Sequence, residues 1–375
     1  MNIKTQPAAV QHEQGEVAII KRAELACRLA KQLEKGGEYE GAYEALKEFW
    51  PDRNKPPSTG SLDECVTAEL LLRAGALAGW LGSSDQTDDQ ETAKNFITQS
   101  AEISEKLGRV VSLAEARGEL AVCYWRDGSY DEARIHLKAA LSLVGDQDAE
   151  VKAILLIRAA IVEVDAQRFD QALRLYDEII PVLEETDDHA LKGTFHNGYG
   201  LLLRRLATPE DREPYMDRAL IEYAAASYHF EQAHNDRYHA RVENNLGFLY
   251  LTIKQFKDAH THLDRARQLF QKLKDIGAAA QVDETRARTL LGQGYVVEAE
   301  RVVRAAVRVL ERGGQQAVLA EALATHGVAL ARLGNDLRSR ALFERAITVA
   351  ETAGDLEGAG RAKLNIIEEL GEKIA

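Results

Sequence analysis

The sequence predicts an all-α protein, a right-handed superhelical solenoid of antiparallel helix hairpins with about seven to eight repeats and a C-terminal helix. The first observation is a small residue that opens each second helix and recurs at intervals of 40, 39, 47, 40, 40 and 40 residues. Helical amphipathicity repeats roughly every 3.6 residues and gives no correlation over such distances, so this period marks a repeated structural unit. The residues are Ala93, Ala133, Ala172, Ala219, Ala259, Ala299 and Ser339.

The second observation is the pattern of one unit, which is clearest from Asn244 onward. The run Asn-Asn-Leu-Gly-Phe-Leu-Tyr holds Gly247, and Ala259 follows twelve residues later, with Leu263 and Ala266 beyond it. Leu-Gly-x2-Tyr followed by Ala-x3-Leu-x2-Ala is the signature of a tetratricopeptide-type hairpin. We expect Gly247 and Ala259 to be small because the two helices cross closely there. The third observation is that only 7 prolines interrupt 375 residues.

The elements follow in chain order. Two helices separated by a Gly-Gly pair at positions 36 and 37 form a first, divergent hairpin. The 47-residue interval contains an insertion, residues 207–215, with two prolines. We therefore expect five segments: a flexible leader over 1–16, the divergent hairpin over 17–50, a proline-rich loop over 51–62, the repeat array over 63–356, and a capping or truncated-repeat helix over 357–375.

Composition restricts the class of protein. Apolar residues make up 45% and charged residues 29%, which is typical of a soluble folded chain, and the formal net charge of −13 disfavours nucleic acid and anionic membranes as partners. No apolar run approaches the ~20 residues that span a bilayer. The three cysteines, Cys27, Cys65 and Cys123, lie in apolar helical patterns, and we expect them to be reduced and buried. These features predict a cytoplasmic protein.

Two segments carry a family resemblance. Residues 242–250 and 341–355 resemble the long-repeat tetratricopeptide proteins of bacteria, with a repeat of about 40 residues. That group includes the sensor regions of transcriptional regulators and the peptide-binding regulators of the Rap kind. The resemblance covers roughly residues 20–375 and implies a protein-binding or signalling role. No helix-turn-helix, nucleotide-binding or receiver domain is visible in the sequence.

Catalytic motifs are absent, so the sequence predicts a protein that is not an enzyme and that uses no cofactor and no metal. Gly292-Gln293-Gly294 follows no strand and is expected to be a turn rather than a dinucleotide loop. A loose group of histidines leaves open a remote alternative, a metal site or an enzyme site across repeats. The histidines are His229, His234, His239, His260 and His262.

The inner face of the solenoid is the better candidate for a binding site. An asparagine amide there can both donate to and accept from a peptide backbone, and an arginine can bind a carboxylate through two hydrogen bonds. The alternative is that Asn245 binds a neighbouring helix and that the arginines are solvated. Glu115, Glu119, Arg126 and Arg158 take equivalent places in earlier repeats. The candidate groove residues are Asn197, Arg204, Arg241, Asn244, Asn245, Arg288 and Arg332.

Four further arginines, spaced by 3, 4 and 4 residues, form one stripe on the outer face of a second helix. Such a stripe is typical of a solvated, salt-bridged surface, or it is a contact patch for an acidic partner. The leading functional hypothesis is a scaffold that binds a protein or peptide in its groove. The alternative is the sensor module of a bacterial transcriptional regulator whose effector domain lies elsewhere. Oligomers through the terminal repeats stay open. The stripe is Arg301, Arg304, Arg308 and Arg312.

Overall fold

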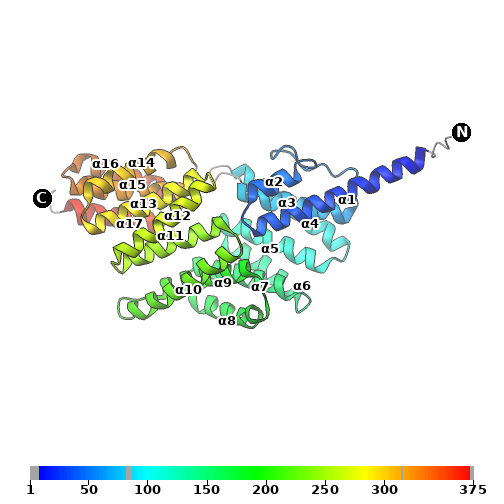
Figure 1. Ribbon diagram of the computed structural model, residues 1–375, viewed down its shortest axis with the longest axis horizontal. Coiled ribbons are helices and arrows are strands. Elements are labelled where there is room, and N and C mark those ends of the chain that lie inside the picture. The colour runs from blue at the N-terminus through cyan, green and yellow to red at the C-terminus, as the bar shows by residue number, and fades with distance from the viewer. Residues whose placement is uncertain (1–7, 82–86, 314–315, 372–375) are drawn as a thin grey trace. The chain divides into compact units, whose positions relative to one another are not determined.

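The chain folds into two compact units of α-helices. The computed structural model describes residues 8–81, 87–313 and 316–371, and the regular elements in these ranges are seventeen α-helices (Figure 1). Unit 1 contains the described residues up to Thr208, and unit 2 those from Pro209 onward. The division falls inside the predicted insertion, residues 207–215. The all-α class and the hairpin organisation agree with the sequence prediction.

Unit 1 consists of successive hairpins. In each pair the first and second helices pack on each other, and the second helix packs on the first helix of the next pair. The described helices are α1 (Ala8–Lys35), α2 (Tyr39–Leu46), α3 (Glu64–Leu81), α4 (Thr87–Lys106), α5 (Val110–Arg126), α6 (Tyr130–Val144), α7 (Ala149–Asp165), α8 (Phe169–Glu185) and α9 (His189–Leu206).

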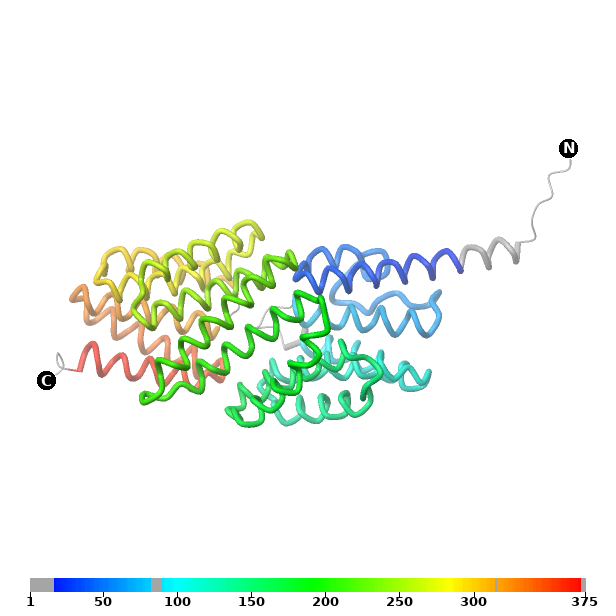
Figure 2. The backbone as a smooth tube through the Cα atoms, turned by 60° about the horizontal axis from the view of Figure 1, so that its bottom comes forward, coloured from blue at the N-terminus to red at the C-terminus, as the bar shows by residue number. Residues whose placement is uncertain are grey.

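Unit 2 repeats the same arrangement and ends on an additional helix that packs on the last hairpin (Figure 2). Its apolar core consists of several clusters along the hairpins, in which alanine is combined with leucine, valine and phenylalanine. The described helices are α10 (Arg212–Gln232), α11 (Asp236–Thr252), α12 (Phe256–Lys272), α13 (Ile276–Gln293), α14 (Val296–Leu310), α15 (Gln316–Arg332), α16 (Asp336–Thr352) and α17 (Leu356–Leu370).

The close crossing predicted at Gly247 is present. A Cβ atom on Gly247 would lie 2.5 Å from Leu263 Cγ and 3.3 Å from the Ala259 carbonyl oxygen, so only glycine fits without a shift of α12. The same position 80 residues later is Gly327, whose Cβ would lie 2.6 Å from Phe343 Cε1. The repeat therefore places its smallest residue where the first and second helices touch.

Short turns between hairpins are closed by Asp or Asn caps. Asn235, Asp275 and Asp355 accept hydrogen bonds from backbone N–H groups three residues later, at 3.1, 3.0 and 2.8 Å. The preceding residue adopts a positive φ, 51° at His234 and 57° at Lys274, which reverses the chain at the end of the second helix. These caps set where α11, α13 and α17 begin, and so determine which side chains these helices present.

The structure describes α1 from Ala8 onward, so this helix overlaps the segment 1–16 that was expected to be a flexible leader; residues 1–7 lie outside the described residues. One expectation about the cysteines needs correction. Cys27 and Cys123 are buried as predicted, and burial raises the pKa of each thiol to about 12. Cys65 is exposed, because it lies in the first turn of α3, ahead of that helix's buried stretch.

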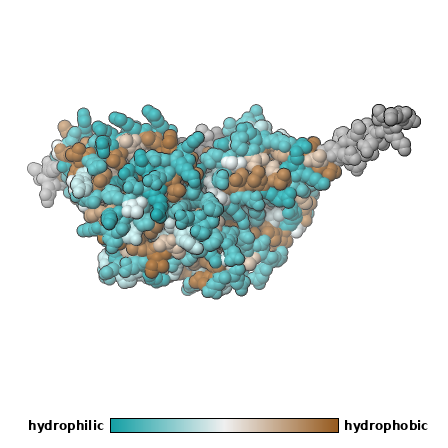
Figure 3. Space-filling model, viewed as in Figure 1, coloured by the Kyte–Doolittle hydropathy of each residue, from teal (hydrophilic) through white to brown (hydrophobic). Residues whose placement is uncertain are grey.

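Hydrophilic side chains dominate the face of the molecule shown in Figure 3, with apolar residues scattered among them. Within the ranges that the structure describes, no helix combines the length and the apolar composition that crossing a membrane would require.

Candidate functional site

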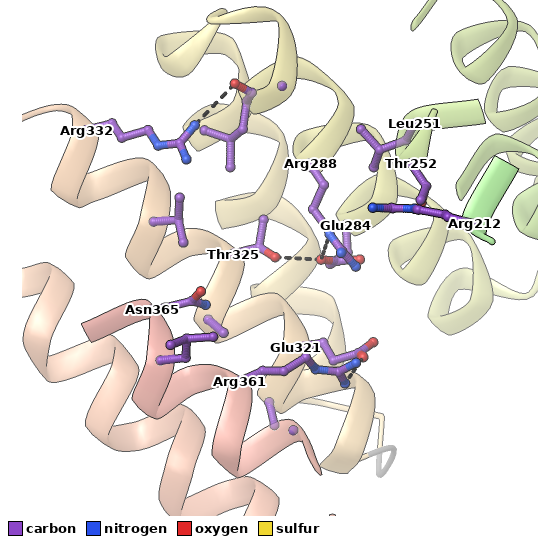
Figure 4. A pocket seen from close by; sticks show the side chains of 17 residues that line it. Arg212, Leu251, Thr252, Glu284, Arg288, Glu321, Thr325, Arg332, Arg361 and Asn365 are labelled. Atoms are coloured by element: carbon purple, nitrogen blue, oxygen red, sulfur yellow. Dashed lines mark hydrogen bonds and ion pairs between the residues drawn. The ribbon is translucent and has the colours of Figure 1, made fainter. Parts of the chain in front are cut away.

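Unit 2 contains a pocket of about 550 Å³, which we call the unit 2 groove (Figure 4). Its walls come from the first helices α11, α13, α15 and α17, together with the start of α10. This volume lies in the range of sites that bind small molecules or peptide side chains. The lining residues are Arg212, Leu251, Thr252, Glu284, Arg288, Leu291, Gly292, Ala320, Glu321, Ala324, Thr325, Val328, Arg332, Gly358, Arg361, Leu364 and Asn365.

Glu284 is a buried carboxylate at the floor of the groove, with 3% of its surface exposed. The Thr325 hydroxyl donates to its Oε1 atom at 2.6 Å, so the hydroxyl supplies one of the hydrogen bonds that a buried carboxylate needs. Arg288 lies one helical turn later, with its Nε 4.0 Å from the same oxygen, and its guanidinium stands 4.9 Å from the Phe248 ring centroid. Glu284 and Arg288 therefore form an ion pair on the groove floor whose distance is too long for a hydrogen bond.

Two other arginines of the groove are held by carboxylates. Arg332 binds Glu369 with Nε and Nη2, the shortest distance being 2.7 Å, and donates to the Leu291 carbonyl oxygen at 3.3 Å. Arg361 Nη2 donates to Glu321 at 2.8 Å. Burial raises the pKa of Glu321, and the nearby Glu284 carboxylate raises it further, while Arg361 and Arg288 oppose the shift. The charged form of Glu321 is thus less favourable than that of an exposed glutamate.

The structure separates the predicted groove residues. Arg288 and Arg332 line the unit 2 groove. Asn244 and Asn245 are partly buried on α11, outside the lining set, and the Oδ1 atom of Asn244 is buried without a hydrogen-bond partner among the described residues. Arg241 is exposed, with its guanidinium 5.3 Å from the Tyr238 ring centroid. Asn197 and Arg204 lie on α9 and belong to unit 1.

Most of the lining residues were not among the predicted groove residues, although the 40-residue period could have indicated Glu321, Arg361 and Asn365. Positions 241, 281, 321 and 361 form one series, which carries Arg241 forward to Glu321 and Arg361. Positions 245, 285, 325 and 365 likewise end at Asn365. Arg212 lies in the insertion, where the period is interrupted, so no spacing argument reaches it.

The equivalent polar residues of unit 1 bind one another. Arg158 Nη2 donates to Glu119 at 2.5 Å, and Lys31 of α1 donates to Glu115 at 2.7 Å. Arg126 donates to the Gly79 carbonyl oxygen and covers the Trp80 ring at 3.7 Å. Unit 1 therefore neutralises its own charges at these positions, whereas the unit 2 groove leaves part of its charge accessible.

Two histidines of the group, His239 and His262, contact a buried carboxylate. Glu243 is fully buried and accepts from the Ser227 hydroxyl at 2.6 Å, with His262 Nδ1 at 2.9 Å and His239 Nε2 at 3.6 Å. Burial alone would raise the pKa of Glu243, but the contacts with His239, His262 and Ser227 outweigh it and hold the pKa well below its ordinary value. The described residues contain no group of three or more His, Cys, Asp or Glu side chains arranged to hold a metal ion.

Arg301, Arg304 and Arg308 are exposed on α14, whereas Arg312 is exposed in the turn after that helix, so the predicted stripe on one helix holds for three of the four arginines. Arg301 lies 3.7 Å from Glu298, and Arg304 lies 3.6 Å from Glu300. No described residue forms an ion pair with Arg308 or Arg312, and exposed pairs of this kind contribute little to stability. The stripe is a solvated surface in this structure, and its role as a contact patch stays a prediction.

The fold and the groove define a tetratricopeptide-type solenoid with a polar hollow on its first-helix face. The structure is similar to that of a Rap protein complexed with competence and sporulation factor, at a TM-score of 0.64 and 12% identity over 91% of this chain and 99% of that one. The apo form of the quorum sensor NprR from B. thuringiensis gives 0.60 and 11% over 91% and 92%.

A third structure is a signal transduction ATPase with numerous domains and a tetratricopeptide repeat sensor, PH0952 from Pyrococcus horikoshii, at 0.55 and 15% identity over 91% of this chain and 54% of that one. No protein-family model matches the chain. No curated sequence relative matches it either. At these identities the likenesses show a shared fold, and they confirm the predicted resemblance to Rap-like tetratricopeptide proteins at that level.

Proposed function

We propose that the protein is a peptide-binding regulatory scaffold and that its ligand lies in the unit 2 groove. The observation that supports this most is the groove itself, because its walls come from four consecutive first helices and combine apolar residues with partly unpaired charge. The similar Rap structure holds a bound signalling factor.

Site-specific photo-crosslinking tests this proposal. A benzophenone amino acid at Leu364, which lines the groove, is compared with the same group at Val297, which is 73% exposed on α14 outside the groove. Each variant is irradiated in an extract of the source cells, and the adducts are identified by mass spectrometry. A peptide or protein segment attached at position 364 and not at 297 supports the proposal. Equal labelling at both positions, or none at 364, contradicts it.

A second candidate is that the chain serves as the sensor region of a longer regulator. The similarity to PH0952 favours it, because this chain aligns with about half of that protein. Under this proposal, ligand binding in the groove acts on an effector domain of the same polypeptide. The intact protein is immunopurified from source cells and its mass is measured. A mass well above 41.5 kDa supports this candidate, and a mass of 41.5 kDa excludes it.

A further inference from the structure

The unit 2 groove is positively charged inside an acidic protein. Four arginines and two glutamates line it, a formal balance of 4 − 2 = +2, and Glu369, which binds the lining residue Arg332, reduces this balance to +1, whereas the whole chain carries −13. A local excess of positive charge in a partly enclosed hollow attracts anions, since the walls exclude much of the screening water. The formal charge of the groove is therefore positive, opposite to the negative net charge of the whole chain.

The arginines of the groove differ in how far the protein itself satisfies them. Arg332 and Arg361 each hold a carboxylate at 2.8 Å or less. Arg288 has only a 4.0 Å approach of its Nε to Glu284, which leaves its two terminal nitrogens without a hydrogen bond to any described residue. Arg212 forms no ion pair or hydrogen bond with the described residues. Two guanidinium groups are therefore available to a ligand.

These two groups lie at the same end of the groove. Figure 4 shows Arg212 extending from α10 toward the space beside Arg288 and Glu284. Leu251 and Thr252 lie next to them on α11. A guanidinium presents donors in a planar fork that matches the two oxygens of a carboxylate. This end of the groove holds two guanidinium groups and one buried carboxylate. It can therefore bind one further negatively charged group.

The rest of the groove is apolar between its charged ends. Leu291, Val328 and Leu364 contribute side chains from α13, α15 and α17. Ala320 and Ala324 add small side chains to the lining. At the opposite end Asn365 offers both a donor and an acceptor to a peptide backbone. The ligand that complements this arrangement carries an apolar side chain and a carboxylate close together.

We propose that the unit 2 groove recognises a carboxylate of a peptide, with Arg288 and Arg212 as its partners, beside an apolar side chain that packs on Leu291, Val328 and Leu364. The carboxylate belongs to a peptide C-terminus or to an Asp or Glu side chain, two sources with the same chemistry. This inference rests on the proposed function and adds the chemical class of the ligand. Arg332 and Arg361 line the groove without binding the ligand carboxylate, because Glu369 and Glu321 already bind their guanidinium groups.

The experiment is an affinity selection from a synthetic random hexapeptide mixture, read by mass spectrometry. The baits are the wild-type chain, Arg288→Gln, Arg212→Gln and the control Arg301→Gln, which removes an exposed arginine of the α14 stripe. Circular dichroism melting first establishes that every variant is folded. Each selected peptide is then resynthesised in three forms: free acid, C-terminal amide, and with Asp and Glu replaced by Asn and Gln. Binding of each form is measured by fluorescence anisotropy.

The inference predicts selected peptides with an apolar residue next to a carboxylate, and about tenfold or greater loss of affinity with Arg288→Gln and Arg212→Gln but not with Arg301→Gln. Loss on amidation identifies the terminal carboxylate as the partner, and loss on the Asn and Gln replacement identifies a side chain. Peptides that bind without any acid preference, and equally to all variants, overturn this inference while leaving the proposed function standing. No selected peptide at all counts against both.

Discussion

At the scale of single residues, Arg73 shows how unit 1 manages buried charge. Its guanidinium lies 2.7 Å from Glu34, 3.2 Å from Glu69 and 3.9 Å from Glu115, and only 6% of the side chain is exposed. Lys31 also binds Glu115, but two positive charges cannot neutralise three carboxylates in a site with little water. Burial raises the pKa of Glu34 to about 7, although Arg73 lowers it. One proton therefore belongs to this cluster at mildly acidic pH.

The raised pKa of Glu34 predicts a pH-dependent free energy of unfolding. Between its ordinary pKa of 4.5 and about 7, the native carboxyl holds a proton that the unfolded chain has released. The stability that Glu34 contributes is therefore complete below pH 4.5 and is lost as the pH rises toward 7, by about 1.4 kcal/mol per pH unit. In Glu34→Gln this slope should disappear. Urea denaturation of both proteins from pH 5 to 8 checks it, and a difference that does not change with pH refutes the assignment.

The contact at Gly247 makes a second prediction. Gly247→Ala should lower the free energy of unfolding of unit 2 by about 1–3 kcal/mol, because the new methyl group meets Leu263 and the backbone of α12. Gly360→Ala is the matched control: it also lies inside a helix, but its Cβ would meet nothing within 4 Å. That change should be neutral or stabilising by up to about 1 kcal/mol. Equal effects of the two substitutions on urea denaturation would show that packing at Gly247 is not tight.

At the scale of the helix, the start of several first helices depends on one capping side chain. Asp148 accepts from the Val151 N–H at 3.0 Å and opens α7. Asp148→Ala should lower the stability of unit 1 by about 1 kcal/mol, because that N–H loses its partner. Asp146→Ala removes a 97% exposed carboxylate two residues earlier and should change little. Chemical denaturation of the two variants side by side tests the difference, and an equal loss would assign the effect to charge rather than to capping.

The helices themselves were the most predictable level. Small residues at Ala259 and Ala299 open second helices, as expected, because a hairpin needs a close crossing at a fixed distance from its turn. The first part of α1 was less predictable, because Ala8, Ala9 and Val10 are followed by six residues without an apolar side chain, and such a stretch has no apolar period to reveal a helix. Exposure of Cys65 was missed for a related reason, since an apolar pattern does not say where a helix first enters the core.

At the scale of the whole molecule, each unit has a core of its own. The clusters around Leu310 and Phe270 are built only from residues after 209. A fragment of residues 209–375 should therefore fold alone and give a cooperative, helical thermal transition. A fragment of residues 256–375 is the control, because it separates α12 from α11 and exposes the contact of Gly247 with Leu263. We expect it to be less stable or insoluble, and circular dichroism with thermal melting compares the two. A 209–375 fragment without cooperative melting would show that unit 2 needs unit 1 to fold.

The sequence by itself determined the hairpin solenoid and the positions that recur along its first helices. A 40-residue period reports the stacking of one unit on the next, which the chain repeats because a single hairpin cannot bury its apolar face. Arg288 and Arg332 could be chosen on that basis, and Glu321, Arg361 and Asn365 lay within reach of the same spacing.

The tertiary structure alone decided which of these positions share one groove and which charges remain available there. Arg332 is held by Glu369, 37 residues away, and Arg158 by Glu119, 39 residues away, and neither pairing follows from a local pattern. Arg212 reaches the groove from an insertion that no period covers. The physical reason is that charge compensation depends on distances of a few ångströms between neighbouring helices, and the packing of those helices, not their periodicity, sets such distances.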